Sequence, residues 1–142
     1  MKLSTGRSVC IALILALIAP CFGCGAPQEL QGTWIGYATD KPRQDWILII
    51  RHDKFNLAAE DSSKCFTGQL ALNWNCRIKK IDLEYCEQSQ CSYNRNISYG
   101  IFKIEDETLT LVAGKPGQHI RPLSFDEPGD AVVYIFEKNR MN

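Results

Sequence analysis

Short segments with the composition of β-strands recur along this chain, and their spacing limits the fold more than any other feature. They are rich in β-branched and aromatic residues, and Asp, Asn, Gly and Pro separate them. The expected strands are Thr33–Thr39, Trp46–Arg51, Lys54–Ala59, Phe66–Asn73, Lys79–Tyr85, Ile97–Ile104, Thr108–Ala113 and Ala131–Glu137. Short strands at intervals of roughly 8–12 residues predict an all-β fold, as an antiparallel sandwich or barrel.

The first 23 residues have the layout of an export signal. Lys2 and Arg7 precede an apolar run over residues 9–19. This run is shorter than the ~20 residues that a membrane-spanning helix needs. We therefore expect residues 1–23 to be a signal peptide and the protein to be exported to an oxidising compartment.

The end of this signal resembles a bacterial lipobox, in which a cysteine after a small residue is acylated and becomes the new N-terminus. Gly23-Cys24-Gly25 fits that end, whereas Cys21 stands where a lipobox usually has an aliphatic residue. The resemblance implies a lipid anchor on Cys24, a short tether over residues 24–29, and a lipoprotein on the membrane of a bacterial cell envelope. Cleavage by an ordinary signal peptidase after Gly23 is the alternative, and it predicts a secreted protein.

The remainder suits one domain, over residues 30–140. Removal of 23 of the 142 residues leaves 119, enough to bury a core. The chain has 16 basic and 16 acidic residues; without Lys2 and Arg7 the basic residues number 14, and the formal charge is −2. The basic residues are scattered along the sequence, so no nucleic-acid partner is expected.

Several motifs in this domain occur in an order known from one family. They are Leu30-Gln31-Gly32-Thr33-Trp34, Lys80-Ile81-Asp82-Leu83, Glu107-Thr108-Leu109-Thr110-Leu111 and Arg121-Pro122-Leu123-Ser124-Phe125. Over residues 30–140 the chain resembles the small, exported, lipocalin-like domain family that is abundant in planctomycete bacteria. The resemblance implies a single antiparallel barrel of about eight strands. It implies no activity.

The same resemblance suggests how one end of the barrel is closed. Gly32-Thr33-Trp34 matches the Gly-x-Trp start of lipocalin-like barrels, in which the tryptophan plugs one end and a basic side chain of the last strand lies over its ring. It implies barrel closure by Gly32, Trp34 and Arg140, with Lys138 as a second basic candidate. A cation over an indole adds roughly 0.5–2 kcal/mol. The alternative is that Trp34 is an ordinary core residue.

Four cysteines in the domain predict disulfides, because the number is even and the compartment oxidising. Alternation places Cys65 and Cys86 on one face of a hairpin. A register that pairs Leu70 with Ile81 sets the two cysteines opposite each other, with Cβ atoms about 4.5–5.5 Å apart. A Cys65–Cys86 disulfide is therefore expected.

Cys76 and Cys91 remain as the second pair, and a local Cys86–Cys91 bridge is the chief alternative. Zinc binding is the functional alternative for all four cysteines. Their spacings of ten, nine and four intervening residues do not match the usual short knuckle of a structural zinc site. We therefore expect no metal.

No catalytic constellation is recognisable, so we expect no enzyme and no cofactor. No serine lies in a nucleophile elbow, no glycine-rich phosphate loop occurs, and His52 and His119 are isolated in expected turns. Among the carboxylates, Asp40, Asp45 and Asp53 lie at strand ends and Glu105-Asp106-Glu107 forms a hairpin turn, whereas Asp82 lies inside a strand and is expected to point outward. A hydrolase is the least favoured hypothesis.

Two binding hypotheses are favoured. In the first, a small apolar ligand occupies the barrel interior. The residues expected to line that interior are Phe66, Leu70, Leu72, Ile81, Leu83, Tyr85, Ile101 and Leu109. In the second, the barrel is packed and the protein is an interaction or inhibitor module that contacts an envelope protein through its loops. The candidate loops are Asp61–Lys64, Glu87–Asn94 and Gly114–Arg121.

Overall fold

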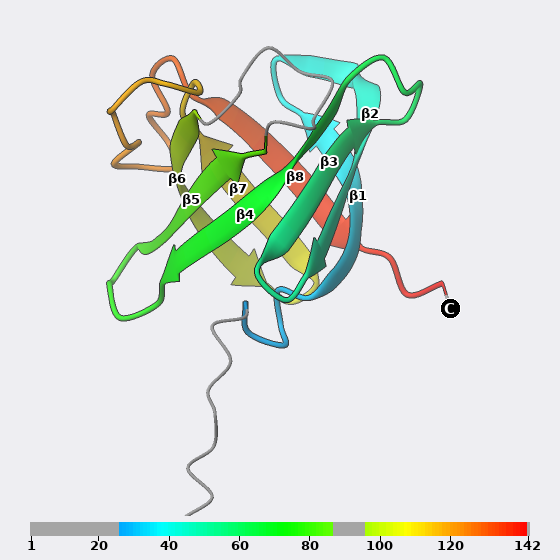
Figure 1. Cartoon of the computed structure of the whole chain (residues 1–142), viewed down its shortest axis with the longest axis horizontal. Coiled ribbons are helices and arrows are strands. Elements are labelled where there is room, and N and C mark those ends of the chain that lie inside the picture. The colour runs from blue at the N-terminus through cyan, green and yellow to red at the C-terminus, as the bar shows by residue number, and fades with distance from the viewer. Residues whose placement is uncertain (1–25, 87–95, 142) are drawn as a thin grey trace, which may run out of the picture.

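The described residues form one closed antiparallel barrel (Figure 1). The structure, a computed structural model, describes residues 26–86 and 96–141. The strands are β1 (Gly32–Ala38), β2 (Lys41–Arg51), β3 (Lys54–Ala59), β4 (Cys65–Asn73), β5 (Lys79–Tyr85), β6 (Ile97–Glu105), β7 (Thr108–Ala113) and β8 (Val132–Lys138). Each strand pairs with the next, and β8 pairs with β1. The prediction of an all-β antiparallel barrel of about eight strands is confirmed.

Residues that alternate along the strands fill the interior. In β2, Trp46, Leu48 and Ile50 are buried, whereas the residues between them are only half-buried. Trp34, Leu109 and Phe136 meet them from other strands and are at most 1% exposed. Each fully buried apolar side chain of this size contributes about 1.5–3 kcal/mol, so this interior is the main source of stability.

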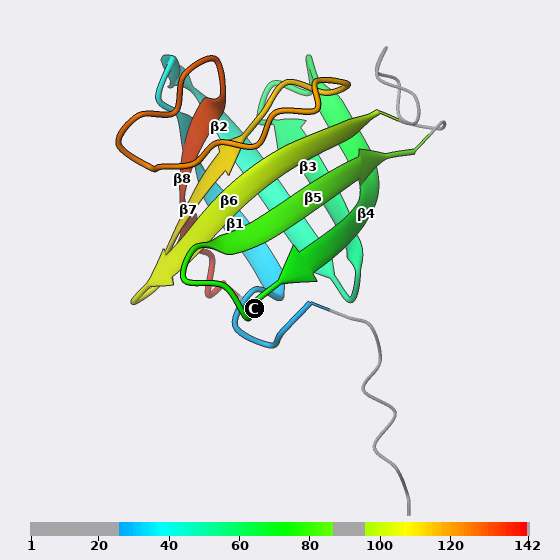
Figure 2. The same ribbon diagram turned by 90° about the vertical axis from the view of Figure 1, so that its left-hand side faces the viewer.

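The barrel has two different ends. The closed end carries the start of β1, the β2–β3 turn at 52–53, the β4–β5 turn at 74–78 and the β6–β7 turn at 106–107. The other end, the mouth, carries the β3–β4 turn at 60–64 and the long segment 114–131 between β7 and β8. In Figure 2 the first described residues, in blue, lie at the closed end, and the orange part of segment 114–131 lies toward the mouth.

The second strand is longer than expected, because it begins at Lys41 and not at Trp46. Residues 41–45 have no β-branched or aromatic side chain, so composition gives no strand signal there. The register with β1 shifts between Tyr37 and Ala38. Pro42 lies in this irregular stretch and is exposed, which suits a residue that cannot donate to a ladder.

The register expected between β4 and β5 is wrong by two residues. Leu70 pairs with Leu83, and Leu72 pairs with Ile81. The turn is wider than expected because Trp74 packs against the closed end, where its ring centroid lies 5.2 Å from that of Phe102 in an edge-to-face arrangement. The β4–β5 hairpin therefore has residues 74–78 in its turn, outside the paired strands.

Residues 114–131, which we call the strap, contact the outer face of the barrel through Arg121. The Arg121 guanidinium donates to the carbonyls of Gly100 at 2.8 Å and Ile81 at 3.3 Å, and it forms an ion pair with Asp82 at 2.6 Å. Asp82 thus points outward, as expected. The prediction that Ile101 lines the interior is wrong: its neighbour Phe102 points inward, while Ile101 lies on the outer face and is nevertheless 1% exposed.

Candidate functional site

The interior near the closed end is filled by side chains. Its remaining void measures about 10 Å³ and is lined by residues such as Leu48, Phe55, Leu83 and Leu111. A void of this size is at or below what one water molecule requires. A ligand held deep in the barrel, as the first binding hypothesis supposes, has no space there.

A larger pocket, the mouth pocket, opens where the barrel interior meets the mouth. It has a volume of about 190 Å³. Its wall is aromatic, because inward-facing positions of β2, β4, β5 and β8 near this end are Trp46, Phe66, Tyr85 and Tyr134. The Trp46 ring stacks on Phe66 with centroids 6.2 Å apart, and Tyr134 meets it edge-on at 5.8 Å.

The hydroxyl groups of Tyr85 and Ser98, which line the mouth pocket, are hydrogen-bonded within the protein. The Tyr85 hydroxyl donates to Ser98 Oγ at 3.2 Å, and Ser98 Oγ donates to the Gly114 carbonyl at 2.6 Å. Ser98 is 1% exposed, so this chain satisfies its hydroxyl where water does not reach. The Trp46 indole N–H, in contrast, is buried and has no hydrogen-bond partner. The wall therefore contains one donor whose desolvation is uncompensated.

The edge of the mouth pocket is positively charged. Lys41, Lys64 and Lys115 line it together with one acidic residue, Asp40, and all four are exposed. Their charges act at the entrance to a pocket whose wall is apolar. This combination favours a ligand with an apolar body and a negative group.

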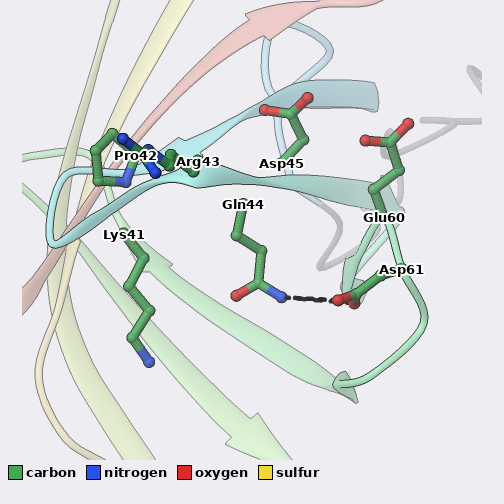
Figure 3. Close-up of a pocket in the computed structure, with 7 residues that line it drawn as sticks. All are labelled: Lys41, Pro42, Arg43, Gln44, Asp45, Glu60 and Asp61. Carbon is green, nitrogen blue, oxygen red and sulfur yellow. Dashed lines mark hydrogen bonds between the residues drawn. The ribbon is translucent and has the colours of Figure 1, made fainter.

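A second hollow lies beside the mouth and is wider and more open (Figure 3). Its volume is about 470 Å³, and most of its lining residues, from 41–45 and 60–61, are exposed. Figure 3 shows Gln44 pointing toward Asp61, to which it donates at 3.5 Å. Hydrogen bonds from the Ser63 hydroxyl and backbone N–H hold the pKa of Asp61 below its usual value. Exposed charges of both signs make this hollow a solvated surface, with no buried group to fix a ligand.

Closure at the opposite end uses Trp34, but with a different cation from Arg140. The Trp34 indole N–H donates to the Leu30 carbonyl at 3.0 Å, and Lys138 Nζ lies 5.2 Å from the ring centroid. Arg140 forms an ion pair with Glu107 instead. The expectation for Arg140 is therefore wrong: β8 ends at Lys138, and Arg140 lies beyond the strand and pairs with a different turn.

Gly32 has a conformational role in this closure. Its φ of +117° is one that side-chain-bearing residues rarely adopt. A Cβ at this position would lie 3.5 Å from Lys138 Cε, so space is adequate and the backbone angle is the constraint. Gly32 allows the chain to turn from the closed end into β1.

Part of the expected tether is held against the barrel. The Ala26 N–H donates to the His52 carbonyl at 2.8 Å, and the Gln31 side chain links the same two residues, donating to the Ala26 carbonyl at 2.7 Å. Leu30 is fully buried. Residues 26–29 thus belong to the closed end and do not form a free linker. Cys24 lies outside the described residues.

The cysteines do not pair as expected within the described residues. Cys86 lies beside Thr67, whose carbonyl accepts from the Cys86 N–H at 2.9 Å, so the two-residue register shift removes Cys65 from the opposing position. No two described cysteines lie at disulfide distance. Cys76 is in the turn at the closed end. Cys91 and the loop Glu87–Asn94 lie outside the described residues, so Cys76–Cys91 and Cys86–Cys91 stay predictions.

Neither histidine belongs to a site in the described parts of the chain. His52 is in the β2–β3 turn. His119 is on the strap, and the centroid of its ring lies 6.0 Å from that of Tyr99 in β6. Within residues 26–86 and 96–141 no group of three or more His, Cys, Asp or Glu side chains could hold a metal ion. The described segments also contain no helix of the length and apolar character needed to cross a bilayer.

The sequence pointed to an apolar interior but not to the mouth pocket. Phe66 and Tyr85 were expected inside the barrel, whereas no sequence signal brings Trp46, Tyr134 and the three lysines together. Only the register of the closed sheet brings them to the same end. No family model, no curated protein and no solved structure matches this chain.

Proposed function

We propose that this protein is an exported, non-catalytic binding module, anchored to a membrane through Cys24, that holds a small ligand in the mouth pocket. The observation that carries the proposal is an aromatic pocket of about 190 Å³ at the mouth of a barrel that is otherwise filled. A cavity of about 150 Å³ lined by apolar side chains is known to bind benzene, so one ring fits this volume. Drug-sized ligands need about 300 Å³ or more, which favours a smaller guest.

The chemistry of the edge favours a ligand that carries a negative group. An apolar ring or short chain would lie against Trp46 and Tyr134, and its anionic end would reach the lysines at the entrance. An acceptor on the ligand could also satisfy the Trp46 N–H if the indole shifts to expose it. An aromatic carboxylate has both parts.

Titration with benzoate tests this proposal, with benzylamine as its charge-reversed counterpart. We expect benzoate to shift the NMR signals of Trp46 and Ser98, and benzylamine to shift them far less. Tyr134→Ala and Lys64→Gln should both weaken benzoate binding, while Lys54→Gln, an exposed lysine at the closed end, should not. Shifts that persist in both mouth variants would place the binding elsewhere. Native mass spectrometry of the protein from its own host would identify a retained ligand.

The anchor has a separate test. Cys24→Ser should block acylation, so the variant should lose the acyl mass and its normal processing. Intact mass measurement of the wild-type protein should show a lipid-modified cysteine at its N-terminus. An N-terminus without added mass would reject the anchor and favour the secreted alternative.

A second candidate function is protein interaction through the strap. Ile120 and Leu123 are 71% and 82% exposed, although they flank Arg121, which fixes this segment to the barrel. Exposed apolar side chains that gather into a patch mark interaction sites, and these two lie close together in the sequence of the strap. An Ile120→Ser/Leu123→Ser variant should lose a specific cross-link to an envelope protein in the host and keep its stability. A cross-linking pattern that is unchanged would reject this candidate.

A further inference from the structure

The closed end brings the start of the described chain next to a group of basic residues. Ala26 is fixed there by its hydrogen bond to the His52 carbonyl. Cys24 is two residues earlier in the sequence. Two residues span at most about 7 Å, so an acyl group on Cys24 would enter a bilayer close to the β2–β3 turn.

The turns nearest to this point are basic. In residues 51–54 and 73–80 the only acidic side chain is Asp53. The basic side chains of these two segments are Arg51, Lys54, Arg77, Lys79 and Lys80. All except Lys79 are exposed; Lys79 Nζ lies 4.5 Å from the centroid of the Trp74 ring.

The acidic turn at the same end is partly neutralised. In the β6–β7 hairpin, Glu105 pairs with Lys103 at 3.5 Å, and Glu107 pairs with Arg140. Asp106 is the remaining carboxylate of that turn. Glu29 is a further exposed carboxylate at this end. The five basic side chains of the β2–β3 and β4–β5 turns outnumber Asp53, Asp106 and Glu29, so the potential of these turns is positive.

From this arrangement we infer that the closed end is the membrane-facing surface, and that its basic residues contact the headgroups of an anionic bilayer. The inference rests on the proposed anchor at Cys24. It also orients the mouth pocket. The mouth is the opposite end of the barrel, so in this orientation it faces away from the membrane, toward the aqueous compartment. A ligand then reaches the pocket from solution and not from the lipid.

Hydrogen–deuterium exchange of the processed, membrane-extracted protein on vesicles tests this orientation. On vesicles of phosphatidylglycerol and phosphatidylcholine, amides in residues 51–54 and 74–80 should exchange more slowly than in detergent, whereas residues 60–64 at the mouth should not change. On pure phosphatidylcholine, or in about 1 M NaCl, the slowing should be lost, because the headgroup interaction is electrostatic and screened. Slowing at the mouth, or equal slowing on neutral lipid, would overturn the inference.

Charge variants supply the matched control. Each basic residue near an anionic surface strengthens binding by about fivefold, so Arg77→Gln/Lys80→Gln should remove most of the slowing. Lys64→Gln/Lys115→Gln removes two exposed lysines at the mouth and should have no effect on it. Equal effects of the two double variants would refute a specific face.

The outcome also separates this inference from the anchor. If the intact mass shows an acyl group but amide exchange at the closed end is not slowed on anionic vesicles, the anchor is supported and the proposed orientation is refuted. A protein without an acyl mass rejects the anchor; slowing at the closed end of that protein would still support the basic surface, and its absence would refute it.

Discussion

Replacement of Lys138 by methionine tests which cation stabilises the closed end. Lys138 Nζ lies 5.2 Å from the centroid of Trp34 and donates to the Glu29 carbonyl at 3.2 Å. A cation over an indole at a partly exposed site is worth about 0.5–1 kcal/mol, and an exposed hydrogen bond adds about 0.5–1 kcal/mol. Methionine keeps an aliphatic chain against the ring, so loss of packing contributes little. We expect the free energy of unfolding to fall by about 1–2 kcal/mol.

Urea unfolding followed by tryptophan fluorescence measures this loss, with Arg140→Gln as the control. The side chains of Arg140 and Glu107 are 76% and 49% exposed, and an exposed ion pair is worth about 0–1 kcal/mol. Arg140→Gln should therefore cost less than about 0.5 kcal/mol. If Arg140→Gln costs as much as Lys138→Met, or if Lys138→Met leaves the midpoint unchanged, the assignment of closure to Lys138 is refuted.

Three further predictions concern other positions. Arg121→Gln should lower the free energy of unfolding by about 1.5–3 kcal/mol, because charge-assisted bonds to backbone carbonyls are lost, and it should speed amide exchange in the strap. Gly32→Ala should cost about 1–3 kcal/mol in thermal unfolding, since alanine is strained at a φ of +117°. NMR titration should give Asp61 a pKa below 3.8, and Ser63→Ala should raise it. Because this pKa is lowered on folding, the associated stability is present above 3.8 and is lost as the pH falls through the folded value.

The positions of the strands could be predicted because the local signal is strong. β3, β5 and β7 have the residue bounds expected from composition and turn residues. The start of β2 could not be predicted, because residues 41–45 have no β-branched or aromatic side chain and their register with β1 is irregular. Whether a segment forms a strand depends mainly on its own residues, whereas an irregular register also depends on the strand with which it pairs.

The strand register, and the side of the sheet on which each residue lies, were harder to predict, because both depend on contacts between distant segments. The β4–β5 turn is wide because Trp74 packs on Phe102, which lies on the next strand. Ile101 is buried on the outside of the sheet, where alternation alone predicts solvent, so a buried position was wrongly equated with the interior. Both errors affected the site: the first placed Cys86 opposite Cys65, and the second added a residue to the expected lining.

The candidate site could be predicted only in part for the same reason. An aromatic residue near the end of a strand gives no sign of which other strands end beside it. Trp46 and Tyr134 are far apart in the sequence, and they come into edge-to-face contact only because β8 pairs with β1 and β1 with β2. The lysines of the mouth come from three separate places, the start of β2, the β3–β4 turn and the strap, and single exposed charges are common in such places.

The pairing of β1 with β8 makes the fold depend on its last strand. Trp34 lies opposite Lys138, so closure of the sheet joins residues separated by most of the domain. A chain shortened before Val132 would leave β1 and β7 with unpaired backbone groups and would open the core to water. Such edges favour pairing with other chains, and contacts of long sequence separation slow folding, which prolongs the exposure of unpaired edges. Proteolytic loss of β8 should therefore turn the closed barrel into an aggregation-prone chain, so folding of the domain depends on this last strand.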